Sequence, residues 1–175
     1  MNRLIMLRSW PTRAFIRGRG DVMEERIGIL EQVGGYTYDT KYDLLFTTER
    51  IIAVIIQHPT DVPYRTNVMD LFIGGQLTKQ RGLSERRKLA EERRRACREK
   101  PLDELVASHR LNFEIRYSTL TSVEVSRGFF HSHLKFHIPG PSSAGRTFHF
   151  TLAGVQVPNA RRLIEQVLPL KIKGK

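Results

Sequence analysis

The sequence of 175 residues contains one cysteine, one tryptophan and no long hydrophobic run. A single cysteine excludes an internal disulfide and a zinc site built from several cysteines, and its scarcity is typical of a reducing compartment. The longest unbroken apolar run, Ile51–Ile56, has six residues, whereas a helix that crosses a membrane needs about 20. We therefore expect no transmembrane segment and a core that needs no metal or disulfide.

Common catalytic motifs are also missing. The sequence has no G-x-x-x-x-G-K-[ST] loop, no G-x-S-x-G elbow and no H-E-x-x-H motif. Arginines surround Cys97 and would favour a thiolate in an exposed side chain, but no base lies near it, so we interpret it as a packing residue. The loop 140–146 offers Arg146 to a phosphate, yet its residue types are common in hairpin loops. We predict a protein that is not an enzyme and needs no cofactor.

Positive charge, in contrast, is abundant and unevenly placed. The formal net charge is +11 at pH 7. Residues 1–20 hold five arginines and no acid, residues 81–100 hold nine basic residues and four acids, and the last five residues add three lysines. The rest of the chain is close to neutral. Local basic segments suit a polyanionic partner, either nucleic acid phosphates or anionic lipid head groups.

The N-terminal segment 1–20 has the composition of a mitochondrial transit peptide, rich in arginine, serine and threonine and free of acids. Pro11 interrupts it, and a disordered basic arm or a wrongly chosen start codon are the alternatives. We exclude this segment from the fold. We expect a cytoplasmic protein at a membrane periphery, or a mitochondrial one if residues 1–20 are a transit peptide.

Strand patterns dominate from Ile27 onward, because short β-branched and aromatic runs alternate with turn residues. The predicted strands lie within 27–38, 42–47, 50–57, 111–117, 121–126, 134–138 and 148–152. Gly34 and Gly35 allow a bulge or a strong bend in the first. The strand 50–57 is apolar on both faces, which indicates that another element covers its outer face.

Residues 58–110 interrupt the strand pattern and are the expected cover. Ser84 is the expected N-cap of a charged helix that Pro101 ends, and Pro101 then begins a second, short helix. Opposite charges one turn apart support the first helix: Arg87 and Glu91, Lys88 and Glu92, Glu91 and Arg95. Its apolar side is thin, so we expect most of it to lie in water. The apolar piece 71–73 is expected to pack on the sheet, with insertion into a membrane as the alternative.

The last predicted element has the clearest pattern. Pro158 begins a helix that Pro169 ends. Its apolar residues recur at i, i+3, i+4, i+7 and i+8: Ala160, Leu163, Ile164, Val167 and Leu168. We expect this helical face to pack against the sheet.

Two stretches resemble a known superfamily. Residues 42–52, YDLLFTTERII, resemble the hairpin of bacterial pleckstrin-homology-like (PH-like) and GRAM domains, and residues 115–128, IRYSTLTSVEVSRG, resemble a later segment of them. The chain from Phe148 onward resembles their last strand and capping helix. The resemblance implies a mainly β fold with α: an antiparallel barrel or split sandwich of about seven strands, capped by the C-terminal amphipathic helix. A single domain, 21–175, would then carry a helical insertion at 58–110.

The arginine-rich helix is the main candidate for a functional surface. The candidate anion-binding residues are Arg86, Arg87, Lys88, Arg93, Arg94, Arg95, Arg98, Lys171 and Lys173. The alternative is a solvated helix, because four acids are interspersed. Nucleic-acid readers usually add exposed aromatic residues that stack on bases, and residues 81–110 contain none. We expect a non-catalytic binding or scaffolding module at an anionic lipid surface or a protein partner, with nucleic-acid binding as the alternative.

The histidines form a second, weaker candidate. His131, His133 and His137 share one face of a strand, and His149 is placed to lie opposite them on the next strand. Neutral imidazoles bind zinc or copper. However, no carboxylate is interleaved, and a solvent-facing strand with its alternate apolar residues buried has the same pattern. We interpret the four histidines as solvent-facing and keep metal binding as the weaker hypothesis.

Overall fold

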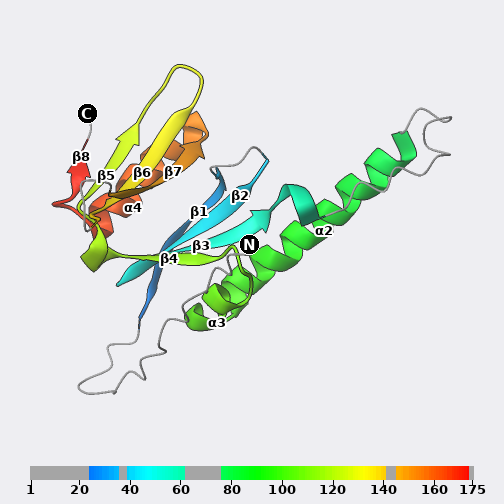
Figure 1. Ribbon diagram of the computed structural model, residues 1–175, viewed down its shortest axis with the longest axis horizontal. Helices are drawn as coiled ribbons and strands as arrows, with labels where there is room; N and C mark the ends of the chain where they lie inside the picture. Colours follow the sequence, from blue (N-terminus) through cyan, green and yellow to red (C-terminus); the bar gives the residue numbers. More distant parts are fainter. Residues whose placement is uncertain (1–23, 36–38, 62–75, 141–144, 174–175) are drawn as a thin grey trace, which may run out of the picture.

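The computed structural model describes residues 24–35, 39–61, 76–140 and 145–173, with the backbone alone at 76–81 and 173. Within these ranges the chain forms an eight-stranded sheet with helices on both sides (Figure 1). The strands are β1 (Arg26–Gly34), β2 (Lys41–Thr47), β3 (Arg50–Gln57), β4 (Phe113–Arg116), β5 (Ser122–Ser126), β6 (Ser132–Ile138), β7 (Arg146–Leu152) and β8 (Ile172–Lys173). The helices are α2 (Gln76–Glu99), α3 (Leu102–Ala107) and α4 (Val157–Val167), with 3-10 turns η1 (Pro59–Asp61), η2 (Tyr117–Thr119) and η3 (Gly154–Gln156).

Seven of the strands pair in antiparallel fashion, as predicted. The order β4-β3-β2-β1-β7-β6-β5-β8 contains two meanders, β1–β4 and β5–β7. They are joined at one register pair, Gly34 opposite Thr151, where a Cβ atom on Gly34 would lie 3.2 Å from the Thr151 Cβ. The sheet is open at β4 and β8, so it is not a closed barrel. The two-residue β8 pairs in parallel with β5, which the sequence pattern did not predict.

The main irregularity of the sheet lies in β1. The register with β2 shifts between Leu30 and Val33, and Gln32 has a positive φ of 57°. The N–H group of Gln32 donates to Oδ1 of Asp43 over 2.7 Å. The sequence allowed a bulge or a strong bend at Gly34 and Gly35. The bulge lies before them because the Asp43 carboxylate satisfies a backbone donor that the ladder leaves unpaired.

The inner face of the sheet packs against α4. The predicted apolar side of this helix is buried, with Ala160, Leu163 and Ile164 no more than 1% exposed. These residues join one core with inward side chains from both meanders, including Phe46 and Phe136. Each fully buried aliphatic or aromatic side chain stabilises the fold by about 1.5–3 kcal/mol. The expectation for residues 158–168 is confirmed to within one residue at each end.

α2 and α3 lie along the outer face of β1–β3 (Figure 1), and a second, smaller core lies beneath them. Its buried members are Leu45, Ile52, Val54, Ile56, Cys97 and Leu105. The segment 58–110 therefore supplies the predicted cover. Cys97 is 1% exposed, and burial raises the pKa of its thiol to about 11, so it is a packing residue. Residues 71–73 lie outside the described ranges.

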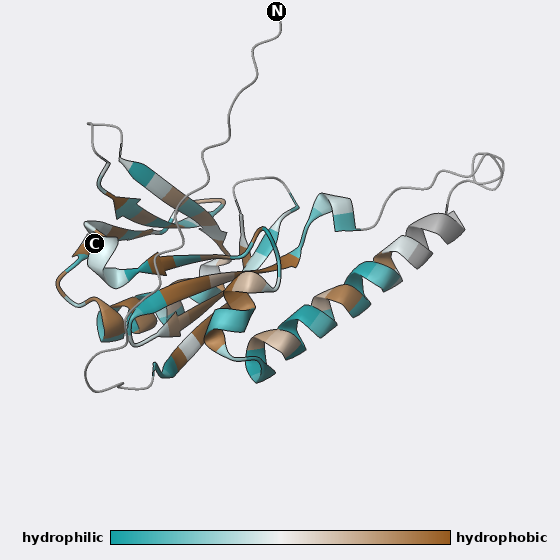
Figure 2. Cartoon of the chain, turned by 60° about the horizontal axis from the view of Figure 1, so that its bottom comes forward, coloured by the Kyte–Doolittle hydropathy of each residue, from teal (hydrophilic) through white to brown (hydrophobic). Residues whose placement is uncertain are grey.

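The insertion helices begin elsewhere than predicted. α2 begins at Gln76, well before the expected N-cap Ser84, because the residues between include the good helix formers glutamine, leucine, lysine and arginine, and the helix tolerates Gly82. Pro101 is the N-cap of α3 and not its first residue. α2 is mostly hydrophilic in Figure 2. None of the helices in the described ranges combines the length and apolarity that crossing a membrane requires.

Candidate binding surfaces

The predicted anion-binding arginines of α2 are divided between two faces of the helix. Arg93 faces the sheet and donates two hydrogen bonds to the Asp61 carboxylate, at 2.6 and 2.8 Å, and one to the Ile56 carbonyl at 3.3 Å. Burial opposes ionisation of Asp61, but these hydrogen bonds and the N–H of His58 lower its pKa below the usual value. Arg93 therefore anchors the helix and is already paired.

Three other arginines of α2 also have partners outside the helix. Nε of Arg94 lies 3.7 Å from Oδ2 of Asp43, a carboxylate that is 1% exposed. Burial, the largest influence, raises the pKa of Asp43, although Arg94 opposes the shift. Arg98 pairs with Glu31 at 3.2 Å, and Arg86 donates to the carbonyl of Pro59 at 3.4 Å.

The solvent side of α2 carries as many acids as bases. Among the side chains described between residues 82 and 99, the exposed charged ones are Arg87, Lys88, Arg95 and Arg98, and Glu85, Glu91, Glu92 and Glu99. In this part of the helix the ion pairs within 4 Å run to residues of β1, β2 and η1 and not along the helix, so the three predicted one-turn pairs do not form. The helix therefore presents a charge-balanced face.

The predicted basic tail is partly engaged. Nζ of Lys171 donates to the carbonyls of Tyr117 and Leu120, at 2.9 and 2.7 Å. Lys171 therefore holds the chain after α4 against the segment that enters β5. The side chain of Lys173 lies outside the description, as do Lys175 and residues 1–20.

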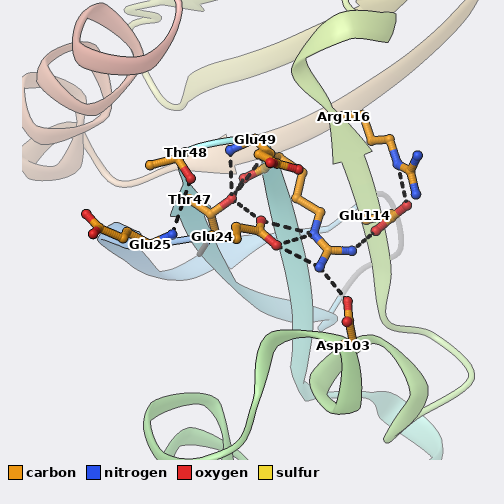
Figure 3. Close-up of polar contacts among 9 residues, drawn as sticks. Glu24, Glu25, Thr47, Thr48, Glu49, Asp103, Glu114 and Arg116 are labelled. Atoms are coloured by element: carbon orange, nitrogen blue, oxygen red, sulfur yellow. Dashed lines mark hydrogen bonds and ion pairs between the residues drawn. The ribbon is translucent and has the colours of Figure 1, made fainter. Parts of the chain in front are cut away.

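An ion-pair network around Arg50 escaped the sequence analysis. Three carboxylates converge on its guanidinium: Glu24 at 2.8 Å, Asp103 at 2.6 Å, and Glu114 (Figure 3). Burial disfavours the charged arginine, but the three carboxylates outweigh it and raise the pKa of Arg50 above its ordinary value. The network joins the chain before β1 to β3, β4 and α3. No local pattern identifies it, because the four residues are far apart in sequence.

Arg26 closes the C-terminal end of α2. Its guanidinium donates to the carbonyls of Cys97, at 3.1 Å, and of Arg98 and Lys100. A cation at this end satisfies carbonyls that lack helical partners. A shallow cavity of about 640 Å³ lies beside it, lined in part by Arg50. The arginines Arg26 and Arg50 at this cavity are already engaged within the protein.

Three of the four predicted histidines lie on the outer face of the second meander, and the prediction that His131 shares this face is wrong. His133 and His137 flank Lys135 on β6, and His149 lies opposite Lys135 on β7. Nε2 of His149 is 2.9 Å from Nδ1 of His133, and burial, His133 and Lys135 lower the pKa of His149. His131 lies apart from them, exposed on the loop before β6.

His137 contacts a different set of residues. Its Nε2 lies 3.4 Å from Oε1 of Glu124, and its Nδ1 lies 3.1 Å from the Thr147 hydroxyl. The structure thus brings together two of the four predicted histidines. In the described ranges no three histidine, cysteine or acidic side chains are arranged to hold a metal ion.

The loop between β5 and β6 carries the largest exposed apolar side chains in the described ranges. Phe129 is 96% exposed and Phe130 84% exposed. The sequence analysis missed this pair, although two phenylalanines after Gly128, between two strands, were a visible signal. Beside the loop lies a cavity of about 550 Å³, lined by His131 and Val155 among others.

No family model matches the chain, and neither a curated protein nor a solved structure is significantly similar to it. The resemblance to PH-like domains thus rests on the sequence motifs alone. Function has to be inferred from the chain's own residues.

Proposed function

We propose that this protein is a non-catalytic binding module of PH-like type that contacts anionic membrane surfaces. The observation that carries the proposal is the outer face of β5–β7. α2 and α3 cover the corresponding face of β1–β3, whereas the described residues place no helix on the outer face of β5–β7 (Figure 1). A sheet face that is left bare and polar is available to a partner.

The charge on this face suits an anionic partner. With the adjoining β5–β6 loop, it carries two cations and four imidazoles against one carboxylate. These residues are Arg127 and Lys135; His131, His133, His137 and His149; and Glu124. Each Lys or Arg near an anionic leaflet contributes about 1 kcal/mol to binding. The charge-balanced face of α2 offers no such excess, so we move the proposed contact from the helix to the sheet.

Vesicle co-sedimentation tests the proposal. We expect the protein to bind vesicles that contain phosphatidylserine and to leave vesicles of phosphatidylcholine alone largely unbound. Binding should fade between 0.1 M and 1 M salt, because the Debye length falls from about 10 Å to about 3 Å. A protein that binds neither vesicle, at either salt concentration, would contradict the proposal.

Charge reversal locates the contact. Arg127→Glu with Lys135→Glu should abolish binding, whereas Arg87→Glu with Arg95→Glu, which changes the net charge equally on the solvent side of α2, should leave most of it. If the helix pair abolishes binding and the sheet pair does not, the contact belongs to α2 as the sequence first indicated.

Nucleic-acid binding is the second candidate, because the exposed pair Phe129 and Phe130 supplies stacking groups that residues 81–110 lack. Mobility-shift assays with single-stranded RNA and duplex DNA discriminate between the two. Tight binding to either, without vesicle binding, would favour this candidate.

A further inference from the structure

We propose that the β5–β6 loop, residues 127–131, inserts Phe129 and Phe130 into the interface of the bilayer. The proposal rests on the proposed function and names its point of contact. It places at the membrane an element to which neither the charge pattern nor the strand pattern drew attention.

The side chains of Phe129 and Phe130 form an apolar knob on the loop. The rings of Phe129 and Phe130 meet edge to face, with centroids 5.0 Å apart and planes at 83°. Gly128 makes the turn tight, because a Cβ atom there would lie 2.1 Å from the carbonyl oxygen of His131. The strands β5 and β6 are paired from Ser126 and His133 onward, so the knob stands on a regular hairpin.

The pair differs from the other exposed apolar residues. Leu83, Val155 and Leu170 are also exposed, but they lie at separate places in the sequence. Single surface hydrophobic residues are ordinary in folded proteins, whereas adjacent exposed aromatic residues mark a contact site. No core residue of the described ranges packs on the Phe129–Phe130 pair.

A membrane interface fits this knob better than a protein groove does. The pair projects from a loop tip and needs no shaped pocket in a fluid layer, where apolar side chains enter about 5–10 Å into the head-group and acyl boundary. The charge next to it is complementary to anionic lipid: Arg127 and His131 flank the two phenylalanines, and the nearest acid in sequence is Glu124. Aromatic rings beside basic groups are typical of interfacial anchors.

The test compares two double variants on vesicles with and without phosphatidylserine. Phe129→Ser with Phe130→Ser should lower the partition coefficient at least about tenfold, because binding scales with the apolar area inserted. The matched control, Leu83→Ser with Leu170→Ser, removes two exposed apolar side chains that lie on α2 and before β8, and it should bind as the unaltered protein does. All four side chains are exposed, and equal thermal midpoints verify that both variants are folded.

A fluorescent label tests insertion directly. Cys97 is 1% exposed, so in Phe129→Cys a polarity-sensitive thiol dye reacts with the new residue. On vesicles with phosphatidylserine its emission should shift to the blue, whereas the dye on Arg87→Cys should show no shift.

The outcomes separate the two proposals. Vesicle binding that survives loss of both phenylalanines, with no shift of the label at position 129, overturns the insertion and leaves the proposed function standing. Absence of vesicle binding by the unaltered protein overturns both. If the phenylalanines are required for RNA binding or for self-association, and not for vesicle binding, the knob serves that partner and the insertion is wrong.

Discussion

The two meanders of the sheet are built alike and covered differently. In β3 every residue from Ile51 to Ile56 is buried, because the main core lies on one side and α2 with α3 on the other. In β6 the apolar residues Leu134 and Phe136 are buried. The residues that alternate with them, His133, Lys135 and His137, face solvent. Each strand's hydrophobic period therefore reports how many of its faces the rest of the chain covers.

This difference separates the meander that the insertion stabilises from the meander whose outer face is exposed. The insertion 58–110 stabilises the first meander, and its arginines serve that purpose: Arg93 and Arg94 bind acids that lie under the helix. The second meander has one face in the core and one face that none of the described helices covers. A basic run in the sequence is thus a poor guide to a basic surface, because some of its arginines form ion pairs with acids of the same chain.

The largest expected effect tests the cover itself. Ile52→Asp places a carboxylate on the outer face of β3, in the small core, where the side chain is 0% exposed. It should cost at least about 4 kcal/mol of unfolding free energy, because a buried charge remains unpaired. Lys135→Asp, on the outer face of β6, should cost about 1 kcal/mol or less, mainly through repulsion of Glu124. Urea unfolding measures both free energies. Equal costs would contradict the conclusion that only the first meander has a covered outer face.

The next effect concerns a polar residue that fastens the cover. Asn112 is buried, accepts a hydrogen bond from the N–H of Ile55 at 2.8 Å and donates one to the carbonyl of Leu105 at 2.6 Å. Asn112→Ala should cost about 1–3 kcal/mol, because it leaves the N–H of Ile55 buried without a partner, whereas the Leu105 carbonyl keeps the hydroxyl of Ser108. Asn159→Ala, at a less buried site on α4, should cost under about 0.5 kcal/mol. A small effect at position 112 would mean that water replaces the amide.

The sequence predicted what depends on local periodicity. The strands, α4 and the need for a cover over β3 follow from patterns of two or 3.6 residues, and the structure agrees with them. Asn112 looked like one more polar residue of an alternating strand, and Arg50 like the first residue of a hairpin strand. Their roles depend on partners such as Leu105 and Glu24, which only the fold brings near.

For the candidate binding surfaces, too, local patterns were predictable and contacts between distant residues were not. The shared face of His133 and His149 was predictable from strand period and hairpin pairing, but their contact was not, because it depends on the register of β6 and β7. The division of the α2 arginines depends on which side of the helix meets the sheet. The phenylalanine pair was readable in the sequence, yet nothing local distinguishes an exposed Phe129 from a buried one.

A smaller effect separates the inner from the outer arginines of α2. Arg93→Ala should cost about 1–3 kcal/mol, because it leaves Asp61 without its partner in a partly buried place. Arg95→Ala, on the exposed side, should cost under about 0.5 kcal/mol. The pair stabilises the fold above the ordinary carboxyl pKa of 3.8. As pH falls below that value and through the lowered pKa of folded Asp61, the acid is protonated and the difference between the variants should disappear. A difference that persists in acid would point to packing of the Arg93 stem instead.

The smallest expected effect concerns His149 on the outer face of β5–β7, which none of the described helices covers. Burial, His133 and Lys135 lower the pKa of His149 below its ordinary value of 6.5. The unfolded chain therefore binds this proton more readily, so the stability that His149 contributes is complete above about pH 6.5 and declines as pH falls through the lowered pKa. The decline should stay under about 1 kcal/mol, because the imidazole pair is in contact with solvent.

Unfolding free energies of the unaltered protein and of His149→Gln, compared between about pH 7.5 and pH 5, measure this contribution. His149→Gln should show a weaker decline with falling pH. His109 also has a lowered pKa, through burial first and then through nearby cations such as Arg93, so His109→Gln separates the insertion's share from that of the sheet. If His149→Gln keeps the full decline and His109→Gln loses it, proton sensitivity belongs to the covered meander and its insertion, and the histidine face of the bare meander is insensitive to pH in this range.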